Sequence, residues 1–73
     1  MFGQILKELR EQKGLLQKDV AKAVGVAHNT YANYELGARE PNYETLIKIS
    51  KYFKKSTDYL LGLVDEFDNP IGK

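Results

Sequence analysis

The stretch that decides the fold runs from residue 15 to residue 35 and reads LLQKDVAKAVGVAHNTYANYE. Its apolar residues fall on one face of a helix expected over 17–24. Gly25 follows, and glycine allows the chain to turn at positive φ without the steric penalty of a Cβ atom. Ala21 is small enough for a second helix, expected over 28–36, to approach closely. The pattern therefore predicts two short helices joined by a turn of about three residues.

Three further helices are expected around this pair. Apolar residues at helical spacing predict a first helix over about 3–13, which ends at a glycine. Asn42 is a good N-cap for a fourth helix that turns Leu46, Ile49 and Phe53 inward. Ser56 can cap a short fifth helix over 57–61. No alternating pattern typical of strands occurs, so the sequence predicts an all-α bundle of five helices.

Length and composition restrict the domain organisation and the classes of function. With 73 residues there is room for one domain, expected over 1–64 and followed by an acidic tail or linker stub over 65–73. The lack of cysteine excludes disulfides and thiolate metal sites, and a single histidine favours neither a metal site nor a cofactor. No apolar run can span a membrane and no signal-peptide pattern follows Met1, so a cytoplasmic protein is expected.

Five blocks of sequence lie in order along the chain: LKELR at 6–10, QKDVAKAVGV at 17–26, NYELGAREP at 33–41, ETLIKI at 44–49 and DYLLG at 58–62. With these blocks the chain resembles the Xre (Cro/repressor) family of bacterial and phage helix-turn-helix regulators. The resemblance implies a phage-repressor-like domain, bacterial or phage-encoded and associated with the nucleoid, whose third helix enters the DNA major groove. The chain departs from the family at Leu16 and Ala27, where a hydroxyl residue usually caps the helix; each lost cap costs about 0.5–2 kcal/mol.

The outward face of the expected third helix carries the candidates for reading DNA bases. Asn29 and Asn33 lie one turn apart, and amide side chains can pair bidentately with adenine. The full base-reading set is His28, Asn29, Asn33, Ala27 and Ala32. No arginine or lysine lies on this helix, so an A·T-rich half-site is expected. The alternative for each polar residue is an ordinary solvent-exposed side chain.

Other residues are assigned to the DNA backbone, to the scaffold or to assembly. Expected phosphate contacts are Gln17, Lys18, Thr30, Arg39, Asn42 and Tyr43. The resemblance implies a structural ion pair between Arg10 and Glu35, and it places Tyr31 and Tyr34 in the core. An apolar group at the chain end is the expected dimer interface, comprising Leu60, Leu61, Leu63, Val64 and Phe67. The alternative is that Leu60 and Leu61 are core residues and the rest belongs to the tail.

The sequence thus predicts a DNA-binding transcriptional regulator, a repressor that binds a palindromic double-stranded DNA operator as a homodimer. Enzymatic activity is not expected, because no histidine–carboxylate or serine–histidine arrangement is evident and the glycines form no phosphate loop. Two alternatives remain open. One is a protein-interaction module, such as an antitoxin or accessory regulator that holds a protein partner or antirepressor. The other is the DNA-binding domain of a longer repressor.

Overall fold

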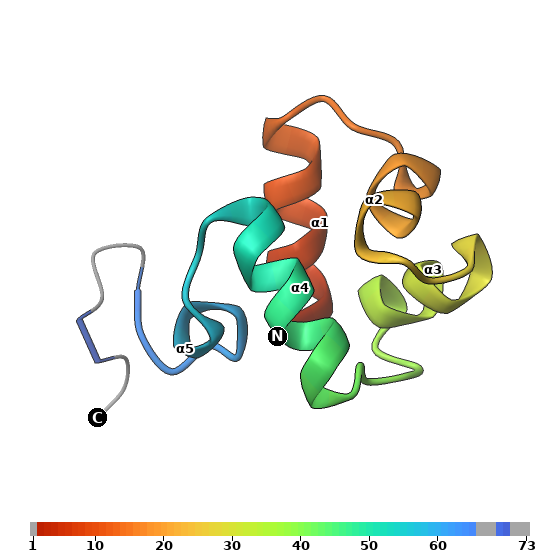
Figure 1. Cartoon of the computed structure of the whole chain (residues 1–73). Helices are drawn as coiled ribbons and strands as arrows, with labels where there is room; N and C mark the ends of the chain where they lie inside the picture. The colour runs from red at the N-terminus through yellow and green to blue at the C-terminus, as the bar shows by residue number, and fades with distance from the viewer. Residues whose placement is uncertain (1, 66–68, 71–73) are drawn as a thin grey trace.

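The computed structural model describes residues 2–65, 69 and 70. Within them the chain forms five helices: α1 (Phe2–Gln12), α2 (Gln17–Val24), α3 (His28–Leu36), α4 (Tyr43–Phe53) and α5 (Thr57–Leu60) (Figure 1). The helices α1 and α2 both pack against α3, α2 also contacts α4, and α5 contacts α1 and α4. The predicted all-α architecture of five helices is confirmed over the described residues. None of the helices in the described ranges is long and apolar enough to cross a membrane.

One hydrophobic core receives side chains from every helix. Its buried members are Leu6, Leu9, Val20, Ala21, Val24, Tyr31, Tyr34, Ile49, Phe53 and Leu60. Tyr31 and Tyr34 are therefore core residues, as expected, and their rings meet edge to face with centroids 6.2 Å apart. Leu60 is fully buried beneath α1 and α4. The expectation that Leu60 belongs to a dimer interface is wrong, because a side chain without exposed surface cannot contact a partner.

The turn between α2 and α3 has the geometry that the sequence predicts. Gly25 adopts a left-handed conformation with φ 79°, and the amide of Val26 donates to the carbonyl of Ala21 at 3.0 Å. Val26 is partly buried and packs against the core. The two helices are consequently held at a fixed angle, with α3 at one end of the molecule (Figure 1).

The helix starts differ in how their free amides are satisfied. Asn42 Oδ1 accepts from the amide of Thr45 at 2.8 Å, and Ser56 Oγ accepts from the amide of Tyr59 at 3.1 Å. Both expected caps are thus present. Leu16 and Ala27 precede α2 and α3 without any side-chain cap, as expected from the missing hydroxyls. At α2 the carboxylate of Asp19 accepts a hydrogen bond from the backbone amide of Leu16 at 2.9 Å, so the N–H group of Leu16 is paired.

Gly3 brings the start of α1 into direct contact with the end of α3. A Cβ atom at this position would lie 2.3 Å from the carbonyl oxygen of Glu35 and 2.6 Å from that of Tyr34. Both distances are far shorter than a carbon atom can tolerate, and both neighbours are backbone atoms. Glycine at position 3 therefore sets how closely α1 supports α3.

Beyond α5 the described part of the chain turns back on itself. Val64 and Pro70 form an isolated antiparallel bridge, and the amide of Asp65 donates to the carbonyl of Asn69 at 2.8 Å. Phe67, which the sequence assigns to the dimer interface, lies outside the described residues. The division into a domain over 1–64 and a tail over 65–73 stays a prediction.

Candidate nucleic-acid interface

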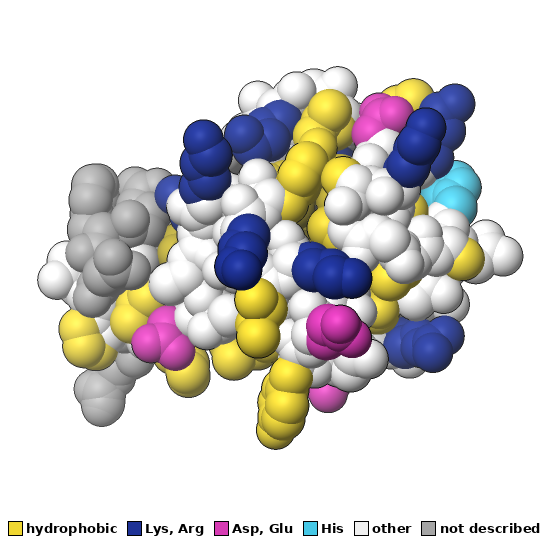
Figure 2. Space-filling view, in the orientation of Figure 1, with side chains coloured by type: hydrophobic (Ala, Val, Ile, Leu, Met, Phe, Trp, Pro, Cys, Tyr) yellow, Lys and Arg dark blue, Asp and Glu magenta, His cyan; other side chains and the backbone are white. Residues whose placement is uncertain are grey.

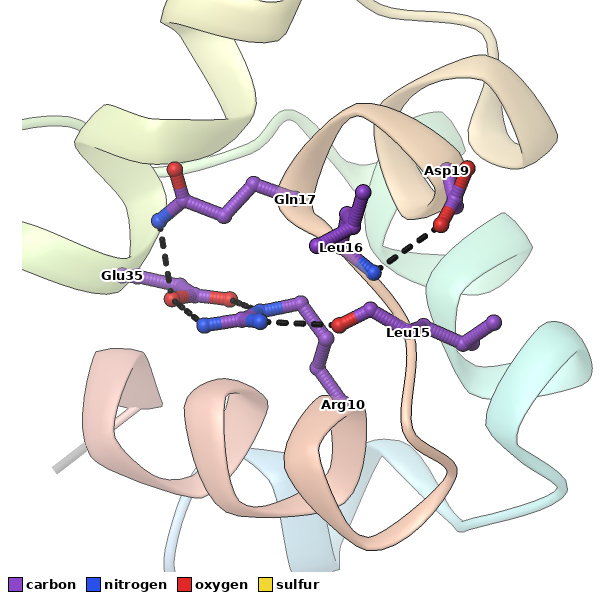
Figure 3. A network of polar contacts seen from close by, with 6 residues as sticks. All are labelled: Arg10, Leu15, Leu16, Gln17, Asp19 and Glu35. Carbon is purple, nitrogen blue, oxygen red and sulfur yellow. Dashed lines mark hydrogen bonds and ion pairs between the residues drawn. The ribbon is translucent and has the colours of Figure 1, made fainter.

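A forked ion pair joins the last turn of α1 to the last turn of α3 (Figure 3). Arg10 Nε donates to Glu35 Oε2 at 2.7 Å, and Arg10 Nη2 donates to Glu35 Oε1 at 3.1 Å. The remaining donor, Arg10 Nη1, reaches the carbonyl of Leu15 at 2.9 Å. One guanidinium thus ties α1, α3 and the connection to α2 together. Because both N–H groups face both carboxylate oxygens, the fork fixes orientation as well as distance.

Gln17, the first residue of α2, is part of the same network. Its amide nitrogen Nε2 donates to Glu35 Oε1 at 3.0 Å, so the start of α2 is anchored to the end of α3 (Figure 3). A side-chain amide carries two N–H donors, and this contact uses one of them. The expected phosphate contact of Gln17 stays a prediction, with the second donor free to make it.

Burial and charge act against each other at this network. The side chains of Arg10 and Glu35 are 13% and 4% exposed. Burial alone would raise the pKa of the Glu35 carboxyl, but hydrogen bonding, from Arg10 above all, outweighs it and holds the pKa below its ordinary value. The Glu35 hydrogen bond likewise raises the pKa of Arg10, against the smaller effect of burial. Burial, with the nearby Glu35 charge, also raises the pKa of the Tyr31 hydroxyl. Arg10 and Glu35 are therefore both ionised at neutral pH.

The outward face of α3 carries the residues expected to read bases. Ala27, His28 and Asn29 are exposed at its start, and Ala32 and Asn33 are half-buried one turn later. Positions 29, 33 and 36 recur at four- and three-residue spacing and so share this face. Leu36, which the sequence analysis did not assign, is 78% exposed here. The helical spacing of the sequence could have placed Leu36 on this face, because it lies one turn beyond Asn33.

The expected phosphate contacts fall into two groups. Gln17 and Lys18 line an open depression between α1, α2 and α3 together with Arg10, Leu16 and His28. Figure 2 shows Lys and Arg side chains gathered at this edge of the molecule, beside the histidine. The structure thus brings two predicted phosphate contacts close to one predicted base contact. Lys18 supplies an exposed positive charge here, which suits contact with a phosphate.

The second group lies at or beyond the far end of α3. Arg39 is exposed in the connection to α4, and Asn42 is exposed although its side-chain oxygen caps that helix. Tyr43 is 86% exposed and lines an apolar groove with Phe2, Glu40, Pro41, Leu46 and Leu61. The structure does not bring these three residues together with Gln17 and Lys18. Thr30 lies apart from this second group: it is half-buried in the first turn of α3, two residues after His28.

The residues left from the expected dimer interface lie directly after α5. Leu61 is 47% exposed, Leu63 is 57% exposed and Val64 is half-buried. Leu61 also belongs to the apolar groove that Tyr43 lines. Among the side chains that the structure describes, no group of His, Asp and Glu is placed to hold a metal ion.

A family model described as "Helix-turn-helix" matches residues 6–60. The chain belongs to the helix-turn-helix family. The resemblance to the Xre (Cro/repressor) regulators is thereby confirmed. The matched residues include the α2–turn–α3 unit and both partners of the Arg10–Glu35 pair.

Relatives and solved structures of this family agree with that assignment. The chain is 49% identical over 61 residues to the HTH-type transcriptional regulator YqaE of Bacillus subtilis, covering 84% of this chain and 53% of YqaE. It is 43% identical to the HTH-type transcriptional regulator ImmR of the same organism, covering 84% of this chain and 48% of ImmR. It therefore spans about half the length of these curated relatives. The P22 c2 repressor in complex with a synthetic operator superposes with a TM-score of 0.79 at 32% identity, covering 82% of this chain and 91% of that one.

Proposed function

We propose that this chain is a sequence-specific, non-enzymatic DNA-binding domain of a transcriptional repressor, which inserts α3 into the major groove of an operator. The observation that carries the proposal is the face of α3. Asn29 and Asn33 point outward from a helix whose inner face is fixed by two buried tyrosines and whose last turn is held by Arg10. Similarity to a repressor crystallised with its operator supports the same assignment.

The roles follow from the chemistry of each group. Amides of Asn29 and Asn33 pair with adenine, and Ala27 and Ala32 accommodate thymine methyl groups. Backbone contacts position the helix without reading sequence: Gln17, Lys18 and Arg39 donate to phosphates on either side of the groove. His28 supplies the one imidazole of the face, which can donate to guanine N7 or to a phosphate.

The proposed function includes dimerisation: two copies of the chain bind one palindromic operator. The support is the apolar surface at and after the end of α5, where Leu61 and Leu63 are exposed. A symmetric dimer places its two recognition helices about 34 Å apart, which is one helical turn of DNA. The chain's own α3 then reads one half-site and that of a second copy reads the other.

The first prediction tests base reading by α3. Binding sites are selected from a random duplex pool, and the best site is used to measure the affinities of the parent and of Asn33→Ala. The variant should lose about 1–3 kcal/mol on the selected site and much less on random DNA, because only the adenine contact is removed. Selected half-sites should be rich in A·T opposite α3.

Asn69→Ala is the matched control, since Asn69 is an exposed asparagine next to the bridge at the opposite end of the molecule. It should bind like the parent. Failure of the parent to enrich any sequence would refute the proposed function. An Asn33→Ala protein that discriminates as well as the parent would refute the assignment of α3 as the reading helix.

A further inference from the structure

Leu36 stands out among the exposed side chains because of the helix on which it lies. The helices α1, α2 and α4 are amphipathic, with apolar residues inward and polar residues outward. The helix α3 lacks this separation: it buries Tyr31 and Tyr34 and also presents Ala32 and Leu36 on its other side. Leu36 is 78% exposed and lies on the same face of α3 as Asn29 and Asn33, so its side chain shares the surface assigned to base reading.

The surroundings of Leu36 leave its side chain accessible. It is the last residue of α3, and Gly37 follows with φ 78°. Gly37 itself is exposed, and a Cβ atom there would meet nothing within 4 Å. The backbone here is held firmly, because the amides of Ala38 and Arg39 both donate to the carbonyl of Asn33. Leu36 is thus an open apolar side chain on a rigid support.

The position of Leu36 relates it to the proposed base contacts. It lies three residues after Asn33 on the same face, which is about 4.5 Å further along the helix axis. Successive base pairs are about 3.4 Å apart. With α3 running along the groove, Leu36 would lie about one base-pair step from the pair that Asn33 faces, before the chain reaches Arg39. The only apolar group that a base presents in the major groove is the 5-methyl group of thymine.

We propose that Leu36 is a specificity-determining residue that contacts the 5-methyl group of a thymine neighbouring the base pair read by Asn33. The inference rests on the proposed function, since it assumes that α3 lies in the major groove. It adds a direct apolar contact to a face otherwise assigned to amides, alanines and a histidine. A half-site selected by this chain then requires thymine, and not merely an A·T pair, at that position.

The test removes the methyl group from the DNA and the leucine from the protein in turn. Each thymine of the selected operator is replaced singly by deoxyuridine, which keeps every hydrogen-bonding group and deletes only the methyl. The parent should bind about four-fold more weakly when the relevant thymine is replaced, the loss that one buried methyl group corresponds to. Leu36→Ala should bind the thymine and uracil duplexes equally.

Ile47→Ala is the control, because Ile47 is an exposed aliphatic residue on α4, outside α3, with no assigned role in DNA contact or assembly. It should retain the full penalty for uracil. Thermal melting of Leu36→Ala should match the parent, since an exposed side chain contributes little to the core. If the parent tolerates uracil everywhere, or if Leu36→Ala keeps the penalty, the inference is refuted while selection of an operator still upholds the proposed function. If no operator is selected, both are refuted.

Discussion

At the residue scale, the ionisation of Glu35 links the interface to the stability of the fold. The pKa of Glu35 lies below its ordinary value, because hydrogen bonding, chiefly from Arg10, outweighs the effect of burial. A carboxyl whose pKa is lowered on folding contributes stability above its unfolded pKa and loses that contribution as pH falls through the folded pKa. The free energy of unfolding should therefore drop as pH falls below about 4.3, the ordinary pKa of glutamate.

Urea denaturation between pH 7 and pH 3 measures this effect. Glu35→Gln should be less stable than the parent at pH 7, because it loses the charged fork with Arg10. Over the acidic range it should lose less stability than the parent does. Parallel pH profiles for the two proteins would contradict the linkage.

The sequence predicts part of this network and misses part of it. The pairing of Arg10 with Glu35 follows from resemblance to a family in which these positions are linked. The hydrogen bond from Gln17 to the same carboxylate was not predicted, because an amide side chain has many candidate partners and only the folded backbone selects one. Leu36 was not predicted for a different reason: it shares the helical spacing of Asn29 and Asn33, but a leucine has no polar group that marks it as a base contact.

At the element scale, the packing of α1 on α3 depends on one glycine. Alanine is the better helix former by about 1 kcal/mol, so intrinsic propensity favours Gly3→Ala. The Cβ atom would nevertheless lie 2.3 Å from the carbonyl oxygen of Glu35, and the backbone there cannot move without displacing α3. Overpacking of this kind costs about 1–3 kcal/mol, so the variant should be less stable than the parent.

Chemical denaturation of Gly3→Ala and Gln4→Ala separates packing from propensity. Gln4 is the exposed neighbour of Gly3 in the same turn, so its replacement should change stability by only a few tenths of a kcal/mol. A stabilised Gly3→Ala protein would show that α1 can shift to make room.

The helices themselves follow from apolar spacing, and α1 and α5 differ from the predicted ranges by one residue at their ends. The close approach at Gly3 leaves no such periodic signal, because a glycine within a helical pattern gives no sign of what lies against it.

At the scale of the whole molecule, the proposed reading helix and the proposed assembly surface belong to different helices. The helix α3 lies at one end, and α5 with the exposed Leu61 and Leu63 lies at the other (Figure 1). The sequence identifies an apolar group at this end of the chain, but it does not show which of its leucines are buried and which are exposed. A helix as short as α5 has no repeated period, so consecutive leucines give no indication that Leu60 points into the core while Leu61 points out.

Because Leu60 is buried and Leu61 is exposed, replacing each should affect a different property of the protein. Leu61→Glu places a charge on the exposed apolar surface and should weaken dimerisation without unfolding the chain, since Leu61 is 47% exposed. Leu60→Ala instead removes a fully buried side chain and should destabilise the fold by about 2–5 kcal/mol. Sedimentation with the selected operator should find two parent chains per site, with protected half-sites centred about 10–11 base pairs apart or a multiple of that. Leu61→Glu should retain the parent's unfolding transition but occupy isolated half-sites. One parent chain on an asymmetric site would exclude a dimer, and unaltered assembly by Leu61→Glu would move the interface elsewhere.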